Sequence, residues 1–182
     1  MKITKTGFDG LLIIEPVVYS DSRGYFLESY NSDVFRKEGI SFVPVQDNES
    51  KSSKGVIRGL HYQLRPFDQA KLIRVIEGKI LDVVLDIRKT SATFGKWFAI
   101  ELDSENRKQL FIPKGFAHGF SVQSNFAVIQ YKCDNLYTPA YERGISVNDP
   151  ALGIDWKTDS SMAIISEKDL KNPHFQDAEY NF

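Results

Sequence analysis

Short apolar runs separated by turn residues recur along the whole chain. In residues 79–88, Leu81, Val83 and Leu85 alternate with Asp82 and other side chains, which is the period of two expected for a strand. Glu-Gly at 77–78 separates this run from the one before it and predicts a hairpin turn. The other runs are 11–18, 25–29, 56–63, 71–76, 97–102, 109–112, 120–123 and 127–133. About ten short strands with this spacing predict a mostly-β sandwich or barrel.

Only two segments carry helix signals. Residues 32–38 begin with capping residues and end before Gly39, and 166–171 begin with Ser166 and end before Pro173. No linker, low-complexity tract or repeat divides the chain, and the part from Pro139 on is rich in turns. We therefore predict a single domain over residues 1–182, with a few short helices and a C-terminal segment that wraps around the barrel.

Net charge, cysteine content and the absence of long apolar runs exclude several classes of function. The net charge is −1 with both signs interspersed, so no nucleic-acid or membrane partner is expected. Cys133 is the only cysteine, which rules out an internal disulfide and favours a reducing compartment. The N-terminus lacks the apolar stretch of a signal peptide, and no run approaches about 18 apolar residues. These features predict a soluble, cytoplasmic protein.

Two of the three histidines lie in strand-like runs. His61 follows Arg58 and Gly59, and an arginine inside a barrel is costly unless it meets an anion. Histidine exchanges protons near neutral pH, although a lone strand histidine is more often structural. Strict alternation would place Arg58 and His61 on opposite faces. If both line one pocket, Gly59 must form a bulge or kink.

His118 ends a motif, Pro-x-Gly-x-x-His at 113–118, that is similar to the second conserved segment of the cupin superfamily. Cupin metal sites carry His-x-His in the first segment, where this chain has His61-Tyr62-Gln63. With His174 near the C-terminus, too few histidines remain for the usual three-histidine, one-carboxylate site. We therefore expect no metal and no other cofactor.

Taken together, the motifs resemble the dTDP-4-dehydrorhamnose 3,5-epimerase family of metal-free cupins, which implies a jelly-roll barrel. Each motif is weak alone, but their order and spacing over nearly the whole chain are specific. They are 21–30 (DSRGYFLESY), 45–48 (VQDN), 58–61 (RGLH), 71–74 (KLIR), 86–89 (DIRK), 112–120 (IPKGFAHGF), 131–132 (YK) and 148–156 (NDPALGIDW).

The resemblance implies an isomerase that inverts C3 and C5 of a 4-keto-6-deoxyhexose carried on thymidine diphosphate, in dTDP-L-rhamnose biosynthesis. His61 would be the base and Asp169 would orient its ring. Lys71 would stabilise the enolate oxygen, and Tyr131 would return a proton from the opposite face. Taken singly, Lys71 also fits an edge charge, Tyr131 a core residue and Asp169 a helix first-turn residue.

The resemblance also implies substrate contacts. Arg58 would meet the diphosphate or the sugar oxygens, and Tyr137 would stack on the thymine. Leu136 stands where many relatives carry a second aromatic residue. Family members are homodimers, so the partner subunit would supply some contacts. The other implied substrate-binding residues are Arg23, Phe26, Glu28, Gln46, Asp47, Asn48, His118, Glu142 and Lys168.

Three alternatives stay open. Related enzymes invert only C3 or only C5 with a nearly identical set of residues. A metal-dependent cupin would require a stoichiometric metal for turnover. A non-catalytic module would bind the sugar nucleotide without any hydrogen exchange.

Overall fold

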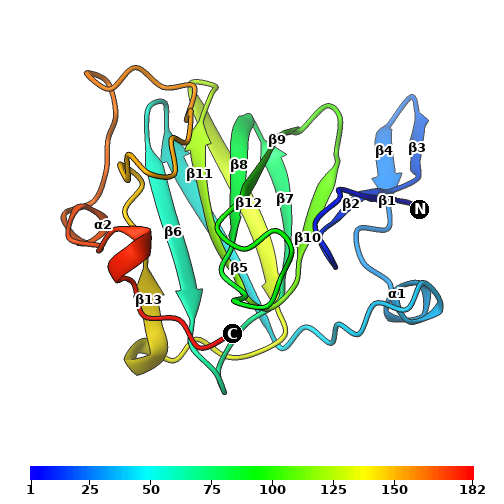
Figure 1. Ribbon diagram of the computed structural model, residues 1–182. Coiled ribbons are helices and arrows are strands. Elements are labelled where there is room, and N and C mark those ends of the chain that lie inside the picture. Colours follow the sequence, from blue (N-terminus) through cyan, green and yellow to red (C-terminus); the bar gives the residue numbers. More distant parts are fainter.

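The computed structural model describes residues 1–182 and consists mainly of two antiparallel β-sheets (Figure 1). The six-stranded sheet has the order β1 (Lys2–Lys5), β2 (Leu12–Glu15), β10 (Gln109–Ile112), β7 (Lys71–Glu77), β12 (Phe126–Cys133) and β5 (Gln46–Ser53). The five-stranded sheet has the order β13 (Glu142–Gly144), β6 (Ile57–Gln63), β11 (Phe116–Val122), β8 (Lys79–Asp86) and β9 (Trp97–Asp103). Strands β3 (Val18–Asp21) and β4 (Gly24–Leu27) form a separate hairpin.

The helices are short. They are α1 (Ser32–Lys37), α2 (Glu167–Leu170) and two 3₁₀ turns at Pro139–Tyr141 and Phe175–Asp177. Both predicted helices are confirmed, and the Ser166 hydroxyl caps α2 by accepting from the Asp169 backbone N–H at 3.1 Å. None of these helices has the length and hydrophobicity that a membrane-spanning helix requires.

Most predicted strands are confirmed, with three omissions and one division. The run 11–18 is divided at Pro16 into β2 and β3, because proline cannot continue the ladder. No apolar run predicted β1, β5 or β13. Strand β5 contains no apolar residue and lies at a sheet edge, paired only with β12.

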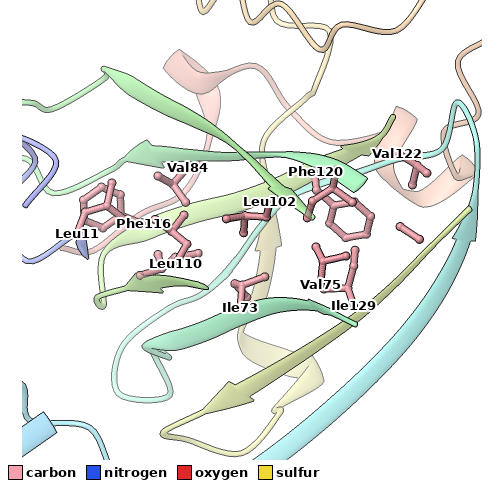
Figure 2. Packing of buried hydrophobic residues seen from close by; sticks show 13 residues of the cluster. Leu11, Ile73, Val75, Val84, Leu102, Leu110, Phe116, Phe120, Val122 and Ile129 are labelled. Atoms are coloured by element: carbon pink, nitrogen blue, oxygen red, sulfur yellow. The ribbon is translucent and has the colours of Figure 1, made fainter. Parts of the chain in front are cut away.

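The main core lies between the two sheets (Figure 2). It includes Ile73 and Val75 from β7, Val84 from β8, and Phe116 and Phe120 from β11. Each fully buried side chain of this size contributes roughly 1.5–3 kcal/mol. This packing fixes the inward-facing positions of the strands that also carry the polar site.

Two further cores cover the outer faces. Leu81, Val83 and Leu85 of β8 pack under the C-terminal segment, which supplies Trp156 and Phe175. The predicted wrapping of the C-terminal segment is thus confirmed. On the other sheet, Phe35, Phe42 and Phe111 belong to a smaller cluster that buries one face of α1.

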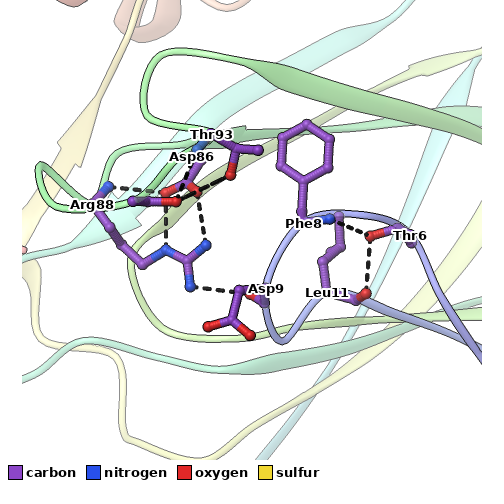
Figure 3. Close-up of polar contacts among 8 residues, drawn as sticks. Thr6, Phe8, Asp9, Leu11, Asp86, Arg88 and Thr93 are labelled. Atoms are coloured by element: carbon purple, nitrogen blue, oxygen red, sulfur yellow. Dashed lines mark hydrogen bonds and ion pairs between the residues drawn. The ribbon is translucent and has the colours of Figure 1, made fainter.

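The loop after β8 is held by a buried carboxylate (Figure 3). Asp86 accepts hydrogen bonds from Arg88 Nη2 at 2.7 Å and from the Ser91 and Thr93 hydroxyls at 2.6 Å each. Burial alone would raise the pKa of Asp86, but these donors keep it below its ordinary value. Arg88 Nη1 also donates to the Asp9 carbonyl at 3.0 Å, so the motif at 86–89 ties this loop to the N-terminal segment.

Strand β6 contains the predicted bulge. His61 pairs with His118 and Arg58 with Phe120, so three steps along β6 match two along β11. Gly59 has φ +134°, and a Cβ there would lie 2.5 Å from the Gly119 Cα. The position therefore requires glycine. The extra residue turns Arg58 and His61 to the same face.

Candidate active site

A pocket of about 270 Å³ opens between the sheets. His61 and Gln63 reach it from β6, whereas Lys71 and Tyr131 reach it from β7 and β12 of the facing sheet. In these strands alternate residues point inward, which is why His61 and Gln63 on β6, and Tyr131 and Cys133 on β12, are spaced by two. The remaining lining residues are Gln46, Asn48, Tyr62, Gln69, Cys133, Tyr137 and Glu142.

His61 is paired with a buried carboxylate. Its Nε2 lies 2.7 Å from Asp169 Oδ1, and Asp169 is only 4% exposed. Burial would raise the pKa of Asp169, but the hydrogen bond and charge of His61 and the Gly59 and Ser166 donors hold it below its ordinary value. Because an ionised carboxylate only accepts, Nε2 carries the proton and Nδ1 is the basic nitrogen.

Tyr131 and Lys71 lie on the facing sheet, with Lys71 Nζ 5.9 Å from the centre of the Tyr131 ring. Burial and the neighbouring Cys133 raise the pKa of Tyr131, against the opposing charge of Arg58. Its hydroxyl is therefore protonated at neutral pH and able to donate. Burial lowers the pKa of Lys71, while Cys133, Glu142 and Asp82 oppose that shift.

A second histidine–aspartate pair lies on the same inner face. His118 Nε2 is 3.0 and 3.1 Å from the two carboxylate oxygens of Asp82, which is fully buried. His118 faces His61 across the β6–β11 ladder but does not line the pocket. The structure therefore places it beside the pocket, where Asp82 holds its ring.

One wall of the pocket is a chain of polar contacts. The Tyr137 hydroxyl donates to Glu142 Oε2 at 2.6 Å, and Lys168 Nζ forms an ion pair with the same oxygen. Burial would raise the pKa of Glu142, but Lys168, Tyr137 and His61 keep it below its ordinary value. A carboxylate thus stands beside the His61 ring.

Other predicted site residues lie elsewhere. Arg23, Phe26 and Glu28 belong to the hairpin region, which Figure 1 shows projecting at the side remote from β6 and α2, and none of them lines this chain's pocket. Asp47 points outward and pairs with Lys132 at 2.6 Å. Arg58 Nε donates to Ser52 Oγ of β5 at 3.0 Å.

Four residues in or beside the pocket were not predicted from the sequence, namely Gln63, Cys133, Gln69 and Asp82. Gln63 and Cys133 lie two positions beyond His61 and Tyr131, so strand periodicity could have found them. Asp82 could have been found as a carboxylate within the apolar run of β8, since buried charges require a partner.

The arrangement can move protons. A carboxylate-oriented histidine and a protonated tyrosine approach the pocket from opposite sheets, with a lysine beside the tyrosine. A carbon atom between them could lose a proton on one face and gain one on the other. The structure contains no group of three or more His, Cys, Asp or Glu side chains arranged to hold a metal ion.

Two sheets with this site define a jelly-roll protein of the cupin type with a histidine–aspartate pair in its pocket. The family model described as dTDP-4-dehydrorhamnose 3,5-epimerase matches residues 5–177, and the chain belongs to that family. The chain is 51% identical to the dTDP-4-dehydrorhamnose 3,5-epimerase of Methanothermobacter thermautotrophicus, over 92% of this chain and 91% of that one.

Two solved structures are similar over nearly their full length. The crystal structure of dTDP-4-dehydrorhamnose 3,5-epimerase from Elizabethkingia anophelis has a TM-score of 0.93 and 49% identity, and covers 97% of both chains. The RmlC epimerase of Legionella pneumophila, crystallised in complex with dTDP-4-keto-L-rhamnose, has a TM-score of 0.92 and 45% identity, with coverage of 96% of this chain and 93% of that one.

Proposed function

We propose that residues 1–182 form one catalytic domain that converts dTDP-4-dehydro-6-deoxy-D-glucose to dTDP-4-dehydro-L-rhamnose by inversion at C3 and C5. The observation that carries the proposal is the placement of the His61–Asp169 pair opposite Tyr131 across one pocket. The keto-rhamnose nucleotide in the Legionella relative supports the same substrate class.

In the proposed reaction, His61 Nδ1 removes the hydrogen from a carbon next to the C4 ketone. The C–H electron pair moves into the enolate, and Lys71 stabilises the negative charge on its oxygen. The Tyr131 O–H bond then breaks, and its proton is added to the opposite face of the same carbon. Asp169 stabilises the imidazolium that forms on His61.

The pocket wall would hold the rest of the substrate. Gln46 and Asn48 of β5 present amides inward, and Tyr137 offers an exposed aromatic ring at the rim. Arg58, fixed by Ser52, carries a guanidinium suited to the diphosphate. We assign Glu142, Lys168 and His118 to substrate contact or to orienting those contacts.

Incubation of the protein with dTDP-4-keto-6-deoxyglucose in D₂O tests the function. We expect deuterium at both C3 and C5, followed by NMR over time, and formation of the doubly inverted sugar. Uptake at one centre only would identify a monoepimerase. Binding without any uptake would make the chain a non-catalytic module.

We propose further that the protein is a cytoplasmic homodimer in which the β3–β4 hairpin reaches the partner's pocket. The hairpin exposes Tyr19, Tyr25 and Phe26, at 64, 54 and 68%. Large exposed aromatic side chains on a projecting element are typical of a contact surface. This placement would bring Arg23 and Glu28 to a pocket that they do not reach within their own chain.

Mixing two inactive variants tests the shared site. One variant carries His61→Asn and the other carries Arg23→Ala with Phe26→Ala. If hairpins are exchanged, each mixed dimer contains one intact site, and remixing restores about a quarter of the wild-type activity. If each hairpin served its own subunit, the mixture would stay as inactive as its components.

A further inference from the structure

The loop of residues 135–138 carries Tyr137 at the rim of the substrate pocket. These four residues belong to no helix or strand, so no regular ladder supplies partners for their backbone groups. Tyr137 is 49% exposed, and in the proposed function its ring meets the base of the nucleotide. The affinity for the nucleotide then depends on what fixes this loop.

Gln63 of β6 makes two of the hydrogen bonds that hold the loop. Its Nε2 donates to the Leu136 carbonyl at 3.2 Å, and its Oε1 accepts from the Thr138 N–H at 2.6 Å. Nε2 also donates to the Phe67 carbonyl at 2.6 Å. Both amide hydrogens are therefore bound to protein carbonyls, and Gln63 is only 4% exposed. The amide has no donor left for a substrate, so any effect on binding must pass through the loop.

Two further glutamines hold the rest of the loop. Gln69 Nε2 donates to the Asn135 carbonyl at 2.8 Å, and Gln46 Oε1 of β5 accepts from the Tyr137 N–H at 2.8 Å. Each residue from 135 to 138 thus has one backbone group bound by a glutamine side chain. A loop that is ordered in advance loses less conformational entropy when a ligand binds to it.

We propose that Gln63 is a positioning residue for the nucleotide, because it fixes the 135–138 loop with the Tyr137 ring already placed for the base. This inference rests on the proposed function. Without the Gln63 amide, binding would have to order the loop, so the affinity for the nucleotide falls. The proton transfers at His61 and Tyr131 should not change, since Gln63 makes a hydrogen bond to neither side chain.

A double-mutant cycle between Gln63 and Tyr137 tests the inference. Gln63→Met keeps a similar volume and removes the amide. Calorimetry measures the Kd of dTDP, and deuterium uptake at saturating substrate measures kcat. We expect Gln63→Met to weaken dTDP binding about tenfold, which is within the range of base–aromatic stacking, with kcat within about twofold of wild type.

The outcome in the second background separates positioning from a general loss of structure. In Tyr137→Ala, the further change Gln63→Met should weaken dTDP binding by less than about twofold, because the ring that Gln63 positions is gone. Equal weakening in both backgrounds would overturn the inference. So would an unchanged Kd in the single variant, or a fall in kcat without a change in Kd.

Gln123 provides the matched control. Its Nε2 donates to Ser121 Oγ at 2.7 Å and to the Trp156 carbonyl at 3.1 Å, and it does not line the pocket. Gln123→Met should therefore leave the Kd of dTDP unchanged. A tenfold loss of affinity in this variant would contradict a specific role for Gln63.

Gln69 keeps the inference testable if Gln63→Met does not fold. Gln69→Met removes only the bond to the Asn135 carbonyl, so we expect dTDP binding to weaken about threefold, and not at all in the Tyr137→Ala background. A loss that persists in that background would overturn the inference. Failure of the proposed function is separately visible in the wild-type protein, as absence of deuterium uptake.

Discussion

Replacement of His61 by asparagine is expected to abolish deuterium uptake at both C3 and C5. Asparagine keeps a hydrogen-bonding side chain beside Asp169 but has no basic nitrogen. A positioned base contributes about 10²–10⁴ in rate, and the same base would serve both centres, so both exchange rates should fall by at least that factor. NMR in D₂O measures the two centres separately.

His174 provides the matched control for His61. It is exposed, lies at the start of the last 3₁₀ turn and makes no side-chain cap bond. His174→Asn should therefore keep wild-type exchange. Undiminished uptake in a folded His61→Asn variant would remove His61 from the role of base.

Replacement of Tyr131 by phenylalanine is expected to separate exchange from inversion. The ring and its packing against the core stay, but the hydroxyl that faces the pocket is lost. His61 could still remove and return a proton on its own face, so deuterium would enter with retention of configuration. Net inversion should fall by about 10²–10⁴. NMR and analysis of product configuration measure the two effects together.

Tyr62 provides the matched control for Tyr131. Tyr62 borders the pocket, but its ring packs in the core under the C-terminal segment and its hydroxyl donates to the Glu179 carbonyl at 2.6 Å. Tyr62→Phe should therefore leave inversion intact. If Tyr131→Phe still inverted either centre at the wild-type rate, the acid would have to be another group.

The sequence pattern predicted those parts of the fold in which one side of a strand is apolar. It also predicted the bulge at Gly59, because Arg58 and His61 could share a pocket only if alternation was broken there. It missed β5, from which Gln46 and Asn48 line the polar pocket. In such a strand both faces are polar, so no hydrophobic period exists to detect.

The sequence pattern predicted only part of the site. His61 and Asp169 are 108 residues apart, and no local spacing signals their pairing, so only the family resemblance connected them. Strand β8 is buried on both faces, which hides the fact that Asp82 points inward toward His118. Arg23, Phe26 and Glu28 could not be placed in this chain's own pocket because they lie on the projecting hairpin.

Because side chains alternate along a strand, the extra residue in β6 decides on which face of the strand each later side chain lies. The chemistry of the pocket therefore depends on whether the number of residues in this part of β6 is odd or even. Without it, every side chain after Arg58 in the strand would exchange faces. His61 would then turn toward the apolar layer under the C-terminal segment, and Tyr62 would enter the barrel. The two sheets could still pack against each other, yet His61 would lie on the side of β6 that faces away from the pocket. A single added position thus separates a jelly roll that only folds from one equipped to move protons.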